Sequence, residues 1–166
     1  METSKINGLL DELCQKVGGK WLLTGGSLIQ LEIDSHRATE DIDLVSIDHE
    51  SLSDVAAQDE MFKAAIRIGL SPESVNSAAS FFVHRLPSWK NQLVILRSGI
   101  KGTIFRPNLT LFLALKLARA TEIDLSDIAA AINAYDSKEF DFELFKTMAD
   151  SKTLERFETH RGKWNI

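Results

Sequence analysis

Two aspartates separated by one residue, Asp41 and Asp43, form the segment of this sequence that most strongly indicates chemistry. Residues two apart in a β-strand point to the same face, so a strand here would bring both carboxylates to one spot. Neighbouring carboxylates repel each other, and burying them requires a cation. A hard divalent ion such as Mg²⁺ (or Mn²⁺), bridging to substrate phosphates, suits such a pair. A lone Asp-x-Asp pair more often marks a solvent-facing acidic strand edge, so that alternative stays open.

Two glycines and a serine, Gly25-Gly26-Ser27, directly follow a short apolar run. Glycines at such a turn let the backbone approach a ligand that any side chain would block. The helix expected after them would present free N–H groups and the positive end of its dipole, which suit a phosphate. The same residues are also typical of an ordinary strand-to-helix turn. The joint pattern is more informative, because thirteen residues separate Ser27 from an Asp-x-Asp pair on a second strand.

The elements that must position these residues are two strands and a short helix. The apolar run over 21–24, closed by glycines, is typical of a buried strand. Ser27 is expected to be the N-cap of a short helix that runs to Leu31. Alternation of apolar and polar residues over 41–45 predicts the second strand. Ahead of them, apolar residues at helical spacing predict a helix over about 6–17.

The middle of the chain predicts one helix and several strands. A segment rich in Ala and Met, over about 55–68, is expected to be a helix. Strand-like runs follow over 81–85, 92–96 and 103–105, with a turn between the first two. The sheet-containing core is therefore expected over about 20–106.

The last third of the chain predicts helices. A strongly apolar helix is expected over 109–120, followed by a helix that Asp124 opens with Asp127 at the capping-box position. Two short polar helices complete the chain. The whole indicates an α/β (α+β) fold: a single domain over residues 1–166 with a helical C-terminal part over about 107–166.

The formal net charge of −5, with 19 Lys and Arg against 24 Asp and Glu, argues against a general nucleic-acid coat protein. The charge is unevenly divided, because residues 74–121 contain no Asp or Glu. This acid-free block is +7, which leaves −12 for the remainder. Either its cations pair with the acidic remainder, or they form a surface that accepts a phosphate or a nucleic-acid backbone. The cations are Arg85, Lys90, Arg97, Lys101, Arg106, Lys116 and Arg119.

Several function classes are excluded by what the sequence lacks. No apolar run approaches the ~18–20 residues needed to span a bilayer, and the first residues carry no signal-peptide pattern. The single cysteine, Cys14, cannot form an internal disulfide. We therefore expect a cytoplasmic protein with no membrane association. The spacing of the histidines predicts no zinc site; they are His36, His49, His84 and His160.

Gly26-Ser27, thirteen residues and then Asp41-x-Asp43 resemble the signature of the DNA polymerase β-like nucleotidyltransferase superfamily. More narrowly, the run His36-Arg37-x-Thr39-x-Asp41-Ile42-Asp43-Leu44 resembles AbiEii-type nucleotidyltransferase-like proteins of bacterial abortive-infection and toxin–antitoxin systems. Two later segments agree. Lys116-x-x-Arg119 followed by Asp124-x-x-Asp127 resembles a helical motif downstream in these proteins, and Leu86-Pro87-Ser88-Trp89-Lys90 resembles a motif of their small single-domain relatives.

The resemblance implies a nucleotidyltransferase-like fold, a small mixed sheet flanked by helices, and a set of roles. Asp41 and Asp43 would bind the metal, and Gly25, Gly26 and Ser27 would hold the nucleotide phosphates. Thr39 matches a small hydroxyl position just before the acidic pair. Arg37 would contact phosphate, with an ion pair to Asp34 or Glu40 as the alternative.

The later motif implies further site residues. Lys116 and Arg119 lie three apart, on one face of their predicted helix, and would balance the triphosphate charge. Asp127 would join them as a catalytic group if its helix turns back toward the sheet. One departure stands out: catalytic members of the superfamily carry a third carboxylate on a later central strand. Both strands expected to hold it, 81–85 and 92–96, lie in the acid-free block.

These observations predict a Mg²⁺-dependent nucleotidyltransferase that moves a nucleoside monophosphate from an NTP to an acceptor hydroxyl on RNA (such as a tRNA) or protein. The resemblance places it in phage defence or in a toxin–antitoxin pair with a cognate antitoxin. The alternative is a non-catalytic nucleotide- or partner-binding module on the same fold, which the missing third carboxylate favours. An antibiotic-type adenylyltransferase would need an acidic acceptor pocket, and the acid-free block argues against it.

Overall fold

The computed structural model describes residues 1–47, 54–164 and 166, and the chain divides into two compact units. Unit 1 comprises residues 1–81 and 93–106, and unit 2 comprises residues 82–92 and 107–166. His49, one of the histidines considered above, lies outside the described residues. None of the helices in the described ranges is long and apolar enough to cross a membrane.

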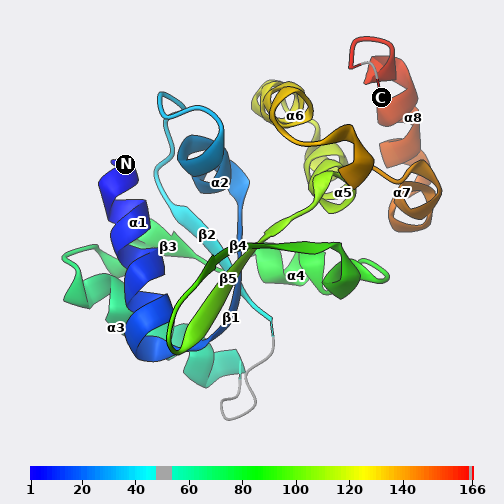
Figure 1. Ribbon diagram of the computed structural model, residues 1–166. Helices are drawn as coiled ribbons and strands as arrows, with labels where there is room; N and C mark the ends of the chain where they lie inside the picture. The colour runs from blue at the N-terminus through cyan, green and yellow to red at the C-terminus, as the bar shows by residue number, and fades with distance from the viewer. Residues whose placement is uncertain (48–53, 165) are drawn as a thin grey trace. The chain divides into compact units, whose positions relative to one another are not determined.

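Unit 1 is built on a mixed sheet with the strand order β3-β2-β1-β5-β4 (Figure 1). Its strands are β1 (Gly19–Thr24), β2 (Ile42–Ser46), β3 (Val75–Asn76), β4 (Leu93–Ser98) and β5 (Gly102–Pro107). β1 is antiparallel to β2 and parallel to β5, whereas β2 and β3 are parallel. The mixed sheet confirms the predicted fold class.

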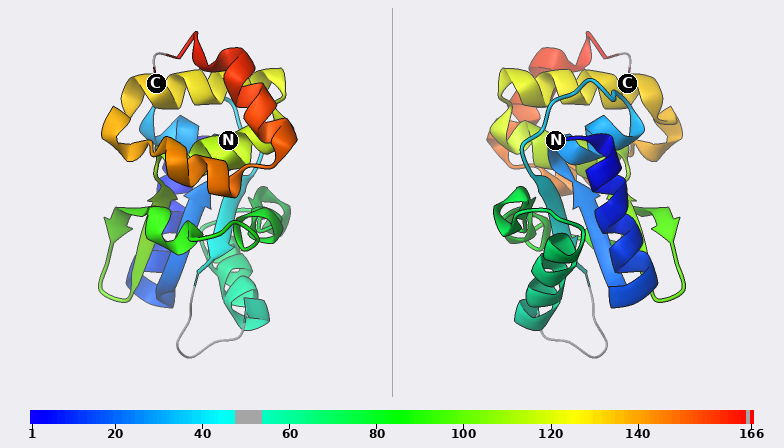
Figure 2. Two further views of the ribbon diagram at one scale, coloured as in Figure 1. Left: turned by 90° about the vertical axis from the view of Figure 1, so that its right-hand side faces the viewer. Right: turned by 90° about the vertical axis from the view of Figure 1, so that its left-hand side faces the viewer.

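Helices cover one face of this sheet. They include α1 (Thr3–Glu12), which continues as a π-helical turn η1 (Leu13–Val17), and α3 (Asp54–Arg67); both lie in front of the strands in the right-hand view of Figure 2. The buried carboxylate of Glu12 joins the two helices through an ion pair of 2.6 Å with Arg67. α2 (Gly25–Glu32) contacts β1, β2 and α1. The 3₁₀ turn η2 (Pro72–Ser74) leads into β3.

Unit 2 is helical, as predicted for the C-terminal part. It contains α5 (Leu109–Arg119), α6 (Glu122–Ala134), α7 (Phe142–Met148) and α8 (Ser151–Arg161), with 3₁₀ turns η3 (Trp89–Gln92) and η4 (Ser137–Glu139). α5 packs against α6, α7 and α8. It is buried over most of its length because its residues are apolar on nearly every face. Fully buried Phe145 and Phe157 pack between α7 and α8 with their rings tilted by 43° and 4.9 Å between ring centroids.

One predicted strand is wrong. Residues 81–85 do not form a strand: α4 (Ala79–Val83) ends there and a turn follows. Aromatic residues favour strands in general, but Phe81 and Phe82 remain 55% and 54% exposed, so no sheet pairing buries them. Local backbone bonds such as Phe81 N–H to the Ala78 carbonyl set the helical turn instead.

Two predicted helix starts are also wrong, each by two or three residues. α2 begins at Gly25, so Thr24 is the N-cap and Ser27 lies inside the helix. Two glycines allow the chain to turn into the helix directly from the strand. α6 begins at Glu122 with Thr121 as its N-cap; the capping box joins Thr121 to Asp124, because each side chain accepts a hydrogen bond from the other's backbone N–H.

Candidate functional site

The turn between β1 and α2 lies against the carboxylate of Asp43. Thr24, the last residue of β1, pairs with Asp43 of β2 in the antiparallel ladder. Gly25 follows with φ of +70°, and a Cβ added to it would lie 1.8 Å from Oδ2 of Asp43 and 2.7 Å from its Cγ. Both the backbone conformation and the space therefore require glycine at position 25.

Asp41 lies one residue before β2, not inside it as predicted, and an amide holds its carboxylate. Asn76 Nδ2 donates to Asp41 Oδ2 at 3.0 Å. Asn76 is in register with Asp43 in the parallel β2–β3 pair. Side chains in register on neighbouring strands share a face, so Asp41, Asp43 and Asn76 form one polar group, called the acidic site below.

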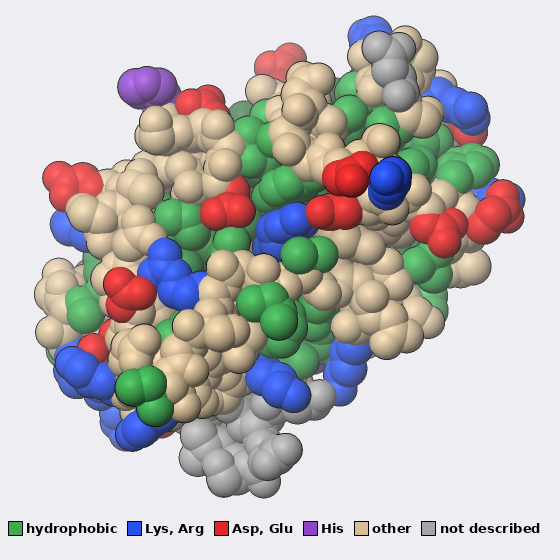
Figure 3. Space-filling model, viewed as in Figure 1, with side chains coloured by type: hydrophobic (Ala, Val, Ile, Leu, Met, Phe, Trp, Pro, Cys, Tyr) green, Lys and Arg blue, Asp and Glu red, His purple; other side chains and the backbone are tan. Residues whose placement is uncertain are grey.

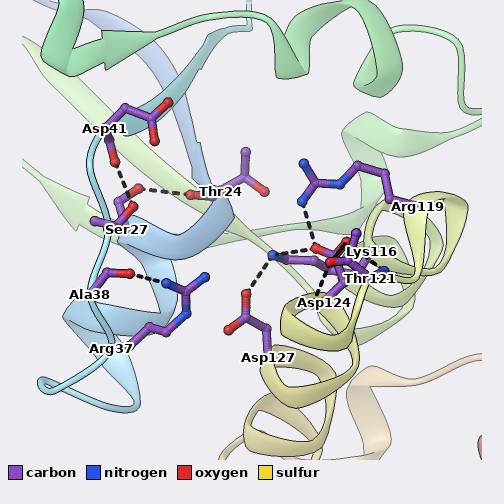
Figure 4. A network of polar contacts seen from close by, with 11 residues as sticks. Thr24, Ser27, Arg37, Ala38, Asp41, Lys116, Arg119, Thr121, Asp124 and Asp127 are labelled. Atoms are coloured by element: carbon purple, nitrogen blue, oxygen red, sulfur yellow. Dashed lines mark hydrogen bonds and ion pairs between the residues drawn. The ribbon is translucent and has the colours of Figure 1, made fainter.

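Side chains from the loop before β2 fold over Gly26. A Cβ on Gly26 would lie 3.0 Å from the Thr39 hydroxyl oxygen and 3.2 Å from Arg37 Nη2. The Arg37 guanidinium also donates to the Ala38 carbonyl (Figure 4). Thr39 Oγ1 donates to the backbone carbonyl of Asp41 at 3.1 Å. The loop thus brings one cation and one hydroxyl to the N-terminal turn of α2.

The Ser27 side chain has an internal role. It is fully buried, its Oγ donates to the Thr24 carbonyl at 3.0 Å, and it accepts from the backbone N–H of Asp43 at 3.3 Å. The hydroxyl therefore ties α2 to the strand that carries Asp43. What this turn offers a phosphate is the backbone of the first residues of α2 and the positive end of the helix dipole.

The charged residues of the later motif form an ion-pair cluster in unit 2: Lys116, Arg119, Asp124 and Asp127. Lys116 Nζ lies 2.7 Å from Asp127 Oδ2 and 3.2 Å from Asp124 Oδ1. Arg119 Nη2 lies 2.6 Å from the same Asp124 oxygen. Figure 4 shows Lys116 of α5 reaching the two aspartates of α6. The Lys116 side chain is only 6% exposed, whereas that of Arg119 is 63% exposed.

The pKa of Asp124 is lowered in this cluster. Burial alone would raise the pKa of the carboxyl, because it disfavours the charged form. Hydrogen bonds from Thr121 and Arg119, together with the charge and hydrogen bond of Lys116, outweigh the burial. Asp124, which was not among the predicted site residues, is thus the centre of the cluster and the N-terminal anchor of α6 at once.

The strand beside β2 is the feature that sequence reasoning missed. β3 has only two residues, Val75 and Asn76, and follows the η2 turn. The third carboxylate was sought on 81–85 and 92–96, but the strand that neighbours β2 in this sheet carries Asn76 level with Asp43. Its signal in the sequence is slight, because a two-residue strand has no measurable period.

Among the described residues, cations of the acid-free block that pair with acids from outside it include Arg97, Lys116 and Arg119. Arg97 of β4 lies 2.6 Å from Asp11 of α1 in unit 1. Lys116 and Arg119 bind the aspartates of α6 in unit 2, as described above. Figure 3 shows acidic and basic side chains intermixed over the face in view. For Arg97, Lys116 and Arg119, the structure therefore supports the first interpretation of the acid-free block, in which its cations pair with acidic residues elsewhere in the chain.

The acidic site fits a divalent cation that is shared with a phosphate-bearing ligand. Among residues 1–47, 54–164 and 166, no group of three or more His, Cys, Asp or Glu could hold a metal on its own. Mg²⁺ typically binds through one or two carboxylates and completes its shell with substrate phosphates and water. Asp41 and Asp43 would supply the two carboxylates, and the Asp43 carboxylate lies against the glycine turn at the start of α2.

Comparison with known proteins identifies the family of this chain. Neither a curated protein nor a solved structure matches the chain significantly. Residues 9–99, more than half of the chain, match the family described as nucleotidyl transferase AbiEii toxin, Type IV TA system. The matched range holds the glycine turn and the whole acidic site and ends before α5. The chain therefore belongs to the AbiEii family of nucleotidyl transferase toxins of Type IV toxin–antitoxin systems.

Proposed function

We propose that this protein transfers a nucleoside monophosphate from an NTP to an acceptor hydroxyl, with Mg²⁺ or Mn²⁺ held by Asp41 and Asp43. The observation that carries the proposal is the position of the Asp43 carboxylate against the Gly25 turn. A carboxylate beside the N-terminus of a helix would repel a phosphate unless a cation lay between them. The Asp43 carboxylate and the Gly25 turn are therefore chemically compatible with a site for a metal-bound nucleotide.

The residues of the acidic site and the glycine turn have distinct roles in the proposed reaction. Asp41 and Asp43 would hold the cation, which would supply positive charge against the triphosphate. The backbone of Gly25, Gly26 and Ser27 takes the phosphates, and Arg37 adds a positive charge over Gly26. The acceptor oxygen attacks the α-phosphorus as the bond to the oxygen bridging to the β-phosphorus breaks, and pyrophosphate leaves with that electron pair. Alignment for in-line displacement is what such a site contributes.

The family's later motif adds proposed roles for the ion-pair cluster of unit 2, and each of these roles stays a prediction: Asp127 would accept the proton of the attacking hydroxyl, and Lys116 and Arg119 would balance triphosphate charge. The exposed Arg119 side chain is accessible to a ligand, whereas Lys116 already serves two buried carboxylates. Lys116 therefore has a structural role in the cluster as well.

The acceptor and the biological setting follow from chemistry and family together. Membership in a Type IV family implies a cognate antitoxin. We propose an RNA or protein hydroxyl as the acceptor, with RNA favoured by exposed cations of the acid-free block such as Lys101, whose Nζ donates to the backbone carbonyl of Lys16 at 3.2 Å. Expression of the toxin with and without its neighbouring reading frame tests the antitoxin: growth arrest relieved by the second protein is expected.

Transfer of label from α-³²P-NTPs to cellular RNA and protein tests the activity. We expect RNase- or protease-sensitive label with the wild type, and at least a ~100-fold loss with Asp41→Ala or Asp43→Ala, the cost of removing a principal electrostatic contact. Asp59→Ala is the matched control, because Asp59 is exposed and pairs with Lys63 on α3. Label transfer that survives both substitutions in the acidic site contradicts the proposal.

The second candidate is a non-catalytic nucleotide-binding module, and Asn76 is the observation that favours it. This amide stands level with Asp43, where a third carboxylate would extend the acidic pair. Calorimetry with NTP and Mg²⁺ separates the two functions. Binding without label transfer supports the module, binding with transfer supports the enzyme, and no binding contradicts both.

A further inference from the structure

The amide of Asn76 has a fixed orientation. Its Oδ1 accepts from the backbone N–H of Ala78 at 2.7 Å, and its Nδ2 donates to Asp41 Oδ2 at 3.0 Å. A backbone N–H can only donate, so the oxygen of the amide must face Ala78 and the NH₂ group must face Asp41. The contact with Ala78 thus directs a hydrogen-bond donor at one oxygen of the Asp41 carboxylate.

The position of Asn76 in the sheet makes this contact specific to the acidic site. Asn76 and Asp43 are partners in the β2–β3 register, and Asp41 precedes the same strand by one residue. The two carboxylates therefore have an uncharged neighbour on their own face of the sheet. The acidic site carries two negative charges instead of three, and one oxygen of Asp41 is already engaged.

We infer that Asn76 is a positioning residue for Asp41, and that the two-carboxylate site takes up its divalent cation only together with a nucleoside triphosphate. Mg²⁺ favours a shell of oxygen ligands and gives up water reluctantly, so two carboxylates alone compete poorly with solvent. Mn²⁺ takes the same kinds of oxygen ligand, and two carboxylates fill only part of its shell. Phosphate oxygens supply the missing ligands and negative charge. This inference rests on the proposed function, because it assigns the order of loading at the same site.

Mn²⁺ binding, followed by electron paramagnetic resonance with and without an α,β-methylene NTP analogue, tests the inference. The Mn²⁺ affinity of the wild-type protein mixed with the analogue should be at least ~10-fold higher than the affinity calculated from the protein alone and the analogue alone. Asn76→Asp keeps an oxygen acceptor for Ala78 but replaces the donor with a third carboxylate. It should therefore bind Mn²⁺ alone at least ~10-fold more tightly than the wild type, the scale typical of residues around a metal site.

Asn7→Asp is the matched control. Its side chain bonds Arg97 of β4, the strand at the opposite edge of the sheet from β3, so it adds the same charge away from the acidic site. It should leave Mn²⁺ affinity unchanged. Asn76→Ala removes the donor without adding charge and should lower the affinity for Mn²⁺ with the analogue about 10-fold, within the range for residues that orient a ligand.

The outcomes separate this inference from the proposed function. Equal Mn²⁺ affinity in Asn76→Asp and Asn7→Asp overturns the inference, and so does wild-type Mn²⁺ binding that ignores the analogue. The second comparison needs no variant, so it decides the matter even if Asn76→Asp does not fold. Neither readout measures nucleotidyl transfer. If the wild type binds Mn²⁺ with the analogue but transfers no label, the inference holds and the proposed enzymatic function is contradicted.

Discussion

A Cβ on Gly25 would lie 1.8 Å from Oδ2 of Asp43, so the carboxylate fills the space that any other residue at position 25 would need. This relationship joins the two motifs that the sequence places eighteen positions apart. Because Gly25, the first residue of α2, and Asp43 of β2 compete for the same space, a larger residue at position 25 requires the Asp43 side chain to move.

Gly25→Ala should disrupt this arrangement. Overpacking costs about 1–3 kcal/mol of the free energy of unfolding, and the positive φ adds about 1–2 kcal/mol. The displaced Asp43 should also abolish binding of Mn²⁺ with a nucleotide. Gly69→Ala is the control, because Gly69 has a φ of +79° and nothing within 4 Å of its missing Cβ. It should show the backbone cost alone in thermal unfolding. Equal behaviour of the two variants contradicts the clash.

Lys116→Met should strongly destabilise unit 2. The substitution removes the cation shared by Asp124 and Asp127, and breaking a buried ion pair by removing one partner costs about 3–5 kcal/mol. Arg119→Ala removes a partner that is mostly exposed and should cost at most about 1 kcal/mol. Urea unfolding measures both.

The double variant Lys116→Met with Asp127→Asn refines this prediction. Removing one of the stranded charges should recover part of the stability lost in Lys116→Met alone. A loss below about 1 kcal/mol in the single variant would show that the cluster is not a stabilising element, and any loss of label transfer would then be a direct effect on catalysis.

The lowered pKa of Asp124 predicts acid sensitivity. The pKa of its carboxyl in the folded chain lies below the ordinary value of 3.8, so the unfolded chain takes up this proton first as the pH falls. Its contribution to stability is therefore complete above about pH 5 and is lost progressively below about pH 4. The stability difference between the wild type and Asp124→Asn should shrink as urea unfolding is measured from pH 7 down to pH 3. A difference that stays constant over this range contradicts the assignment.

Ala120→Gly should stabilise the protein. Ala120 ends α5 in the left-handed conformation, with φ of 52° and ψ of 44°. Glycine removes the strain of a side chain there and gains about 0.5–1 kcal/mol after its larger entropy in the unfolded chain is counted. Ala118→Gly, two residues earlier in the last turn of α5, should lose about as much. Calorimetric melting temperatures that move in opposite directions confirm the cap.

Local patterns explain what could be predicted. Apolar runs and hydrophobic periodicity identified β1, β2, β4, β5 and the main helices, because each of these elements is long enough to show a recognisable pattern of apolar residues. The glycine turn and the aspartate pair were recognised from residue type and spacing. The strand predicted from Phe81 and Phe82 was wrong, because the strand propensity of an aromatic residue depends on packing against a neighbouring strand. Both side chains are more than half exposed, so no neighbouring strand buries them.

The sequence by itself thus determined the fold class, and it identified the Asp41 and Asp43 carboxylates and the glycine turn as candidate site residues. Only the tertiary structure decided that Asn76 is the neighbour of Asp41 and Asp43, because β3 joins β2 across more than thirty residues of chain and register is a property of the pair. It also decided that Lys116 is buried between two aspartates. Burial of a charge depends on which helices pack around it, and no spacing along α5 records that.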